Sequence, residues 1–455
     1  MLLLFAFVLP VSAQDDCTFG VIEAYYRPDD AVALGACWDR VIFAWDQFQP
    51  ENADDFDASV IPVSIFDDAR TANRQIVGLI KGTPEWASES GSLGAAPDGI
   101  DLPFDDRDNH FGAFVTRLVE HYSPLGVHHW IIWNEPDIRP GEGVVEFQGE
   151  VEDYFYLLRT AYLAIKAADP EAHVQIAGLT WWFDRNHYRT FYLRRLLQRI
   201  YADPEAEANN WYFDGATAHI YFTTSSVWQI LMDYVDALRD FGMSDKDLWL
   251  AEFNASPRRD PQAPLDALFQ VSLEQQADFI VQASALALAA GVDKLAVYKL
   301  YDNHFIAGES EAWGLVRGDG SLRPAFESYA QVIERLDPSA DVNRYSIPQG
   351  TLIAFTKPES TLYVVWSDTF TGGEFLIHAG GLEGSVSVYD ALGEARVIEL
   401  VEDAGVPLAV IDAPAAERID LPWVVVSGAV SLVELPGVPR TVWYRTDGGQ
   451  VIQMR

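Results

Sequence analysis

The chain has 455 residues, a length that predicts one large domain followed by a smaller one. Hydrophobic residues make up 49% and aromatic residues 13%, which excludes a disordered protein, and the interspersed charges exclude a bundle of membrane helices. Because 31 Lys and Arg stand against 68 Asp and Glu, the formal net charge is −37, and such a field repels a phosphate backbone. We therefore expect a globular protein with a well-solvated acidic surface and no nucleic-acid partner.

The first residues resemble an export signal. Leu2 to Val11 form a short apolar run that ends at the small residues Ser12 and Ala13, where a signal peptidase would cut. The run is too short for a bilayer, which needs about 20 apolar residues. We predict a signal peptide at residues 1–13, secretion to an extracellular or periplasmic location, and no membrane attachment after cleavage.

Cys17 and Cys37 are the two cysteines of the chain. In an exported protein they are expected to form a disulfide that ties the N-terminal segment to the first layer of the fold, with a stabilisation of about 3 kcal/mol from loop closure. Two free buried thiols are the alternative. Two cysteines cannot form a thiolate cage, and the nine histidines show no His-x-His or His-Glu-x-x-His pattern, so no metal site is expected.

Short β-branched or aromatic runs then alternate with longer amphipathic stretches, as a parallel βαβ sheet requires. Helical spacing is clear from Tyr154 to Ile165 and from Ile230 to Leu238, and the last helix is predicted from Pro324 to Leu336. Eight such strands predict an α/β fold, a (β/α)8 TIM barrel over residues 14–342. The predicted strands are Phe19–Ala24, Val41–Trp45, Gln75–Ile80, His129–Trp133, Val174–Ala177, Gly215–Ile220, Leu248–Glu252 and Leu295–Lys299.

After about residue 343 the pattern alternates with period two between Gly, Pro, Asp and Ser turns, which predicts an all-β sandwich over residues 343–455. The tail from Gly437 is either an extra strand pair or a frayed end. The sandwich either braces the barrel or binds glycan. Its predicted strands are Thr351–Thr356, Leu362–Trp366, Glu374–His378, Ser385–Tyr389, Arg396–Leu400, Leu408–Ile411, Trp423–Val426 and Ser431–Glu434.

Glutamates end two of the predicted barrel strands. The fourth strand runs into WIIWNEPD, which contains Glu135, and the seventh runs into LWLAEFNAS, which contains Glu252. Barrel enzymes place their reacting groups at the carboxyl ends of the strands. Strands four and seven face each other across the mouth, so the two carboxyl groups are expected to converge at the ~5–5.5 Å of a retaining glycosidase. One strand-end glutamate alone is more often a solvated rim residue; two in these places predict a catalytic pair.

Environment suggests the roles of the pair. Trp133 and the negative charge opposite favour a protonated Glu135, the form a general acid needs. Glu252 must stay ionised to attack the anomeric carbon, and the donor for it is His219 or Tyr221 at the end of the sixth strand, with Tyr221 assigned the orienting role. A satisfied core histidine is the alternative for His219.

Three further residues are predicted to bind the substrate. Asn134 is placed to hydrogen-bond the sugar 2-hydroxyl. Trp86 and Trp313 are candidate stacking platforms for a pyranose face, although aromatic residues in a barrel more often belong to the core.

Several motifs together resemble clan A glycoside hydrolases. They are the Asn-Glu-Pro ending of strand four, the Glu ending of strand seven, TPEWAS at Thr83 to Ser88, and GLVRGDGSLRPAFESY at Gly314 to Tyr329. LAEFNAS looks closest to family 39, whose barrel is likewise followed by a β-sandwich, and family 5 is the other near relative. The resemblance implies a double-displacement mechanism with Glu135 as acid/base and Glu252 as nucleophile.

Two positions depart from that resemblance or match it loosely. Arg40, which opens RVIFAW on strand two, matches the strand-two arginine of the clan only loosely. Lys299 stands about where relatives often carry a tryptophan platform. Lys299 is therefore a substrate contact or the ion-pair partner of Asp302 or Glu252.

The function these observations predict is a secreted retaining glycosidase that cleaves β-linked poly- or oligosaccharides and needs no cofactor. Two alternatives stay open. One is an enzyme for uronic-acid sugars, in which Lys299 neutralises the substrate carboxylate. The other is a carbohydrate-binding barrel protein without turnover. The carbohydrate substrate is the only partner expected, and neither the linkage nor the oligomeric state follows from the sequence.

Overall fold

The structure is a computed structural model, and it describes residues 17–221, 223–257, 259–262, 270–303, 312–419, 425–438 and 440–454. The predicted signal peptide at residues 1–13 lies outside the described residues. Among those described, no helix is long and apolar enough to cross a membrane.

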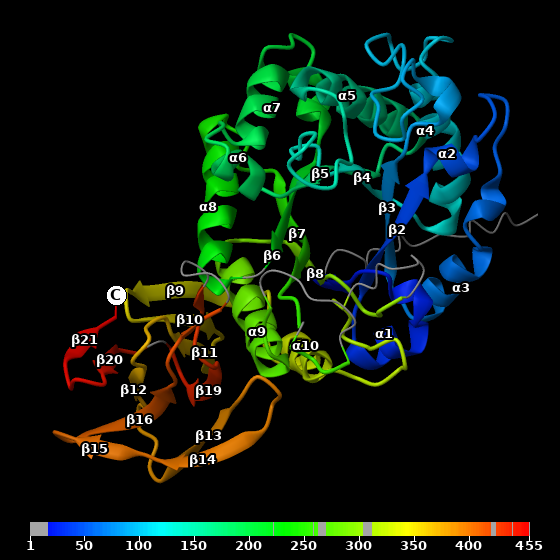
Figure 1. Ribbon diagram of the computed structural model, residues 1–455. Coiled ribbons are helices and arrows are strands. Elements are labelled where there is room, and N and C mark those ends of the chain that lie inside the picture. Colours follow the sequence, from blue (N-terminus) through cyan, green and yellow to red (C-terminus); the bar gives the residue numbers. More distant parts are fainter. Residues whose placement is uncertain are drawn as a thin grey trace, which may run out of the picture.

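Eight parallel strands close into a barrel in chain order, so that the last strand pairs with the first. The predicted (β/α)8 fold is confirmed, and Figure 1 shows the strands surrounded by their helices. The barrel strands are β1 (Phe19–Val21), β2 (Trp38–Ala44), β3 (Gln75–Lys81), β4 (His129–Asn134), β5 (His173–Leu179), β6 (Gly215–Tyr221), β7 (Asp247–Asn254) and β8 (Lys294–Val297).

Two strand boundaries differ from the prediction in a way that matters for the site. β2 begins at Trp38 because that residue pairs with both Gly20 and Gln75, so Arg40 lies inside the strand and does not open it. β8 ends at Val297, so Lys299 belongs to the loop after the strand.

The three predicted helical stretches are confirmed as α5, α8 and α10, whose apolar faces join the core of the barrel. The α-helices are α1 (Pro28–Leu34), α2 (Trp45–Phe48), α3 (Val63–Thr71), α4 (His110–Tyr122), α5 (Val151–Ala168), α6 (Trp182–Asn186), α7 (Tyr192–Tyr201), α8 (Thr224–Asp240), α9 (Leu273–Ala289) and α10 (Pro324–Arg335). The 3-10 helices are η1 (Ala24–Tyr26), η2 (Ala58–Val60), η3 (Glu85–Ala87), η4 (Ser123–Leu125) and η5 (Glu207–Tyr212).

Large rings fill the interior of the barrel. Trp38 and Trp249 are fully buried there, with ring centroids 5.9 Å apart, beside small and branched side chains from the other strands. The ring of Trp38 lies so close to Gly20 that a Cβ at residue 20 would stand 2.3 Å from it. Glycine on β1 is therefore what allows tryptophan on β2.

The C-terminal strands form two antiparallel sheets with a shared apolar core, as the alternating pattern predicted. The six-stranded sheet has the order β14-β13-β19-β11-β10-β9, the five-stranded sheet has the order β15-β16-β12-β20-β21, and β17 pairs with β18. The tail forms the hairpin β20–β21, the extra strand pair. The strands are β9 (Asp341–Ile347), β10 (Gly350–Thr356), β11 (Ser360–Ser367), β12 (Gly373–His378), β13 (Ser385–Tyr389), β14 (Ala395–Glu399), β15 (Val401–Asp403), β16 (Val406–Ala413), β17 (Glu417–Arg418), β18 (Val425–Val426), β19 (Ser431–Pro436), β20 (Val442–Thr446) and β21 (Val451–Gln453).

The sandwich docks on helices α8 and α9 of the barrel (Figure 1). The outer face of its larger sheet continues the apolar core of the barrel through residues such as Phe355 and Trp366. Polar contacts flank this packing: Gln282 donates to the carbonyl oxygen of Gly428 at 2.8 Å, and Asp278 accepts from the amide of Val430 at 3.0 Å. These contacts give the sandwich a bracing role on the side of the barrel.

Candidate active site

Charged side chains from opposite strands meet at the carboxyl end of the barrel. Glu252 near the end of β7 is 6% exposed, and Nη2 of Arg40 on β2 donates to its Oε1 at 2.5 Å. The hydroxyl of Tyr221, the last residue of β6, donates to the other oxygen, Oε2. Both carboxylate oxygens of Glu252 therefore accept a hydrogen bond.

These partners set the protonation of Glu252. Burial by itself would raise the pKa of this carboxyl group, but the charges of His219 and Arg40 and the hydrogen bonds from Tyr221 and Arg40 outweigh burial and hold the pKa below its ordinary value. Burial and the charge of Glu252 raise the pKa of Tyr221 well above its ordinary value, so the phenol keeps the proton that it donates. The site thus holds a buried, ionised carboxylate.

Glu135 lies just past the end of β4 in an unusual backbone conformation. Its φ is 43° and that of Trp133 is 71°, both in the left-handed region that side chains rarely adopt. The amide of Glu135 donates to the carbonyl oxygen of Gly178 on β5 at 3.0 Å, which fixes the turn to the barrel. Residues held in this way cluster at functional sites.

The ring of Trp133, expected beside Glu135, packs instead on Phe147, and its Nε1 donates to the carbonyl oxygen of Glu146 at 2.8 Å. Trp133 therefore holds the loop that follows β4. The apolar run gives no sign of the left-handed backbone at residue 133. For this reason the sequence did not predict the direction of the Trp133 ring.

His219 connects the two glutamates. Its Nδ1 lies 2.8 Å from Oε1 of Glu135 and 3.5 Å from Oε2 of Glu252. The ring fits only because β5 carries Gly178, where a Cβ would stand 2.0 Å from Nε2 of the imidazole. His219 is 2% exposed and so is both a buried histidine and part of the site.

The two carboxyl groups are close. One oxygen of Glu135, one of Glu252 and a ring nitrogen of His219 all lie within 4.8 Å of one another. Such a trio is also a candidate for a metal ion, and it is the one such group among the described residues. The guanidinium of Arg40 already forms an ion pair with Glu252. A metal ion bound to the same carboxylate would be repelled by the positive charge of Arg40. The trio is better suited to proton transfer and nucleophilic attack than to metal binding.

Two other predicted residues join this group. Asn134 is the last residue of β4, and within the described part of the chain its buried Oδ1 accepts no hydrogen bond. Trp313 lies with its ring centroid 5.1 Å from that of Tyr221, so an aromatic face stands beside the nucleophile's donor.

Trp86 and Lys299 both have defined partners in the structure. Trp86 in η3 donates to the carbonyl oxygen of Gln49, and its ring packs on that of Trp45. Lys299 was expected to pair with Asp302 or Glu252, or to contact substrate. Its Nζ lies 3.1 Å from Oε2 of Glu23, because the loop after β8 turns the side chain toward β1.

Asp302 has a different partner. It accepts from Arg323 at 2.7 Å in a fully buried network that also holds Asp260, and this network ties the loops after β7 and β8 to the start of α10. Arg323 belongs to the GLVRGDGSLRP segment. The role of this arginine is therefore to anchor the loops at the mouth of the barrel.

The disulfide pairs Cys17 with Cys37 and so joins the segment before β1 to the residue before β2. It lies at the amino end of the barrel, away from the glutamates.

Sequence reasoning did not assign Asp137, the last residue of the NEPD motif. It is 1% exposed, and its Oδ2 accepts from the amide and hydroxyl of Thr180 and from the amide of Trp181. Burial raises its pKa to about 7, against the hydrogen bond from Thr180 and with the help of the Glu135 charge. Asp137 ties the loop after β4 to the loop after β5 and so positions Glu135. Its place next to the motif was the available signal.

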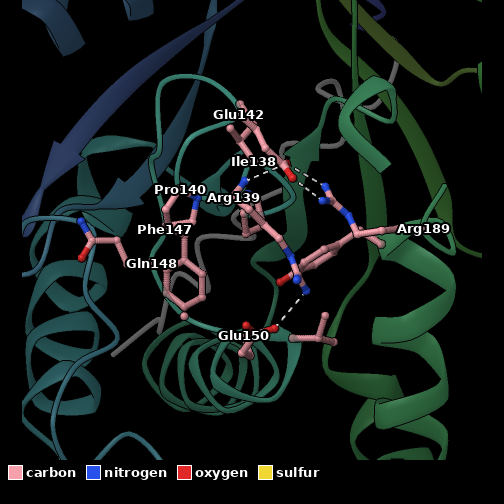
Figure 2. A pocket seen from close by; sticks show the side chains of 12 residues that line it. Ile138, Arg139, Pro140, Glu142, Phe147, Gln148, Glu150 and Arg189 are labelled. Carbon is pink, nitrogen blue, oxygen red and sulfur yellow. Dashed lines mark hydrogen bonds and ion pairs between the residues drawn. The ribbon is translucent and has the colours of Figure 1, made fainter. Parts of the chain in front are cut away.

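A separate hollow of about 350 Å³ lies beneath the loop between β4 and α5. Figure 2 shows that its charged side chains turn toward each other: Arg189 toward Glu142, and Arg139 toward Glu150 at 3.1 Å. The bonds from Arg189 lower the pKa of Glu142 to about 2. Neither Glu135 nor Glu252 lines this hollow, and its charged side chains pair with each other, so we interpret these pairs as a support of the loop.

Comparison with known proteins supports this architecture. No protein-family model matches the sequence, and no curated protein matches it significantly. Solved structures do match. A family 39 glycoside hydrolase from Bacteroides cellulosilyticus superposes with a TM-score of 0.65 at 14% identity, over 93% of this chain and 81% of that one.

Two further neighbours are a family 30 endoxylanase from Clostridium papyrosolvens and a family 39 β-xylosidase from Caulobacter crescentus. The first has a TM-score of 0.58 at 12% identity and covers 93% of this chain and 97% of that one. The second has a TM-score of 0.54 at 15% identity and covers 94% and 97%. The predicted resemblance to clan A, near family 39, is confirmed at the level of the fold.

Proposed function

We propose that this chain is a secreted retaining glycoside hydrolase that cleaves β-linked oligo- or polysaccharides. The observation that carries the proposal is the pair of carboxyl groups at the ends of β4 and β7, which have oxygens within 4.8 Å of each other. Arg40 and Tyr221 keep the carboxyl group of Glu252 ionised. The clan A fold of the neighbours supports the same conclusion.

In the first step Glu135 gives its proton to the glycosidic oxygen while Glu252 attacks the anomeric carbon. The bond from that carbon to the leaving oxygen breaks, and an ester bond to Glu252 forms. In the second step Glu135 takes a proton from water, the water oxygen attacks the same carbon, and the ester bond breaks. Two inversions leave the configuration unchanged.

The separation of the carboxyl groups favours retention. An inverting enzyme needs about 6.5–9.5 Å to admit a water between base and sugar, and a retaining enzyme needs about 5–5.5 Å. Oxygens within 4.8 Å fit the shorter distance.

Hydrogen bonds to both oxygens of Glu252 serve the nucleophile before attack, because they keep the carboxylate charged and fix its plane. Nδ1 of His219 lies near both glutamates. When Glu252 loses its charge in the ester, its attraction for the imidazole weakens, and the imidazole interacts more strongly with Glu135. The buried Oδ1 of Asn134, which accepts no hydrogen bond from the described residues, can accept one from a sugar hydroxyl beside the acid.

Azide rescue tests the two roles. We would assay wild type, Glu135→Ala and Glu252→Ala on aryl β-glycosides, including a uronide, with and without azide. An activated aryl leaving group needs little acid assistance, so Glu135→Ala should form the glycosyl-enzyme and release a β-glycosyl azide. Glu252→Ala should instead give the α-glycosyl azide, because azide occupies the place of the missing nucleophile.

Glu146→Ala is the matched control, since Glu146 is a glutamate at the same end of the barrel that pairs with Lys81 at 2.5 Å. It should keep most of the activity. Equal residual rates in the Glu135 and Glu252 variants would contradict the assignment. Binding of glycan by a wild type that hydrolyses none of the panel would favour the non-catalytic alternative.

Secretion is part of the proposal. The Cys17–Cys37 disulfide supports it, because disulfides persist in oxidising compartments. Recovery of the chain from the culture medium or periplasm with a new N-terminus after Ala13 is the expected result.

A further inference from the structure

Glu23 and Lys299 form an ion pair at the carboxyl end of the barrel, after β1 and after β8. Nζ of Lys299 lies 3.1 Å from Oε2 of Glu23, and 2.6 Å from Oδ1 of Asn303, whose Nδ2 lies 3.4 Å from the same glutamate oxygen. The side chain of Lys299 is 3% exposed and that of Glu23 is 17% exposed. Glu23 therefore presents the accessible edge of the pair.

The order of the strands places this pair beside the nucleophile. In the closed barrel β8 and β1 lie between β7 and β2. Glu252 on β7 and Arg40 on β2 nevertheless touch each other, so their side chains meet on the inner side of the barrel next to β8 and β1. Glu23 and Lys299 follow the ends of those two strands.

An aromatic contact links the pair to the same place. Nζ of Lys299 stands 5.6 Å from the ring centroid of Tyr298, and that ring is 6.2 Å from the ring of Tyr221, the donor to Glu252. The ion pair and the nucleophile thus border one region of the mouth.

We propose that Glu23 is a specificity-determining residue that binds hydroxyl groups of the sugar attacked by Glu252, that Lys299 positions it, and that the pair selects neutral glycosides against uronides. This inference rests on the proposed function. A carboxylate oxygen accepts hydrogen bonds from sugar hydroxyls, and an ammonium group at 3.1 Å keeps the carboxylate charged and in place.

The charges argue against a uronate in this position. Lys299 would be the cation for a substrate carboxylate, but Glu23 already neutralises it. An incoming uronate would have to displace Glu23 and would meet the negative charge of Glu252 nearby. Charged groups that must give up a buried partner lose more than they gain.

Substitution of the two partners should shift specificity in opposite directions. Glu23→Gln keeps the shape but removes the negative charge 3.1 Å from Lys299, so the ratio of kcat/KM for an aryl β-glucuronide to that for the aryl β-glucoside should rise at least about tenfold. Lys299→Met leaves Glu23 charged beside the sugar, so the same ratio should fall, and the effect of either variant should shrink at high salt. Glu146→Gln, in a second Lys–Glu pair at this end of the barrel, should leave the ratio unchanged.

Several outcomes would overturn the inference. One is a wild type that prefers the glucuronide and loses that preference in Lys299→Met. Another is a set of active variants whose ratios stay within twofold of wild type, which would place the pair outside the subsite while the proposed function stands.

Absence of turnover on every glycoside would refute the proposed function instead. Binding then decides the inference, by ligand-observed NMR with methyl β-D-glucopyranoside and methyl β-D-glucuronide. Wild type should bind the neutral sugar, and Glu23→Gln should gain affinity for the glucuronide. Equal binding of both sugars by both proteins would reject the inference.

Discussion

The two ends of the barrel both bury a cation, but the cations have different partners. At the carboxyl end Arg40 donates to the carboxylate of Glu252. At the amino end Nζ of Lys294 donates to the carbonyl oxygen of Cys17 at 2.5 Å and to Oε1 of Gln75 at 2.9 Å, below the ring of Trp249. Arg40 thus donates to a carboxylate, whereas these two hydrogen bonds of Lys294 go to neutral oxygens.

This difference teaches what each end does. A cation beside a titratable group changes the pKa of that group and so tunes its chemistry. A cation that donates to backbone and amide oxygens holds the chain segments that supply those oxygens, and Lys294 does so at the end of the barrel away from Glu135 and Glu252. The amino end therefore seals the fold, with the disulfide and Lys294, and the carboxyl end prepares a carboxylate for reaction.

The largest expected effect comes from Arg40→Met. Loss of the arginine removes a charge and a hydrogen bond from Glu252, so we expect kcat/KM to fall about 10²–10³-fold, or about 3–4 kcal/mol. The pKa of Glu252, which is lowered in the wild type, should rise, and the acidic limb of the pH–rate profile should move to higher pH.

Arg74→Met is the control for this prediction, because Arg74 is an equally buried arginine just before β3 at the amino end. It should affect stability without moving the acidic limb. If the acidic limb of the pH–rate profile does not move in folded Arg40→Met, the proposed difference between the two ends of the barrel is wrong.

Removal of the disulfide should cost about 3 kcal/mol of unfolding free energy, the value for a loop of this length. Denaturant titration of Cys17→Ser/Cys37→Ser measures it, and dithiothreitol should have no further effect on that variant. The activity of the folded protein should stay at the wild-type level. A large loss of kcat would show that the amino end also serves the chemistry.

Lys294→Met should lower the unfolding free energy by about 2 kcal/mol, because the oxygens of Cys17 and Gln75 lose a buried donor. Thermal or denaturant unfolding measures the change. Its pH–rate profile should superpose on that of the wild type, in contrast to Arg40→Met. A shifted profile would contradict the separation of roles.

The smallest expected effect concerns Asp137. This buried carboxyl group lies at the same end of the barrel as Glu252, but its pKa is raised, whereas that of Glu252 is lowered. Its pKa is raised to about 7, so its contribution to stability is present below about pH 4 and is lost as the pH rises through about 7. Asp137→Asn keeps an oxygen for Thr180 and should remove this loss.

The variant should therefore gain about 1–2 kcal/mol relative to the wild type between pH 5 and pH 6. Paired unfolding measurements at the two pH values give the difference. A constant difference between variant and wild type would show that Asp137 is ionised throughout.

Much of the fold was predictable because its determinants are local. Apolar runs such as that of β7 and the helical spacing of α5 depend on neighbouring residues only, so their number and order could be counted along the chain. The same locality exposed Glu135 and Glu252, since each follows an apolar strand. Strand boundaries that depend on pairing with other strands could not be predicted from the sequence. The start of β2 is an example, because it depends on its partners in β1 and β3.

By itself the sequence determined the eight strand-and-helix units, the β-sandwich and the two strand-end glutamates, because hydrophobic period and strand ends are written in consecutive residues. Only the tertiary structure decided that Arg40 reaches Glu252, that Gly178 makes room for His219, and that Lys299 pairs with Glu23. The physical reason is closure of the barrel: contacts across its mouth join strands far apart in the chain, and their distances follow from the closed ring of strands.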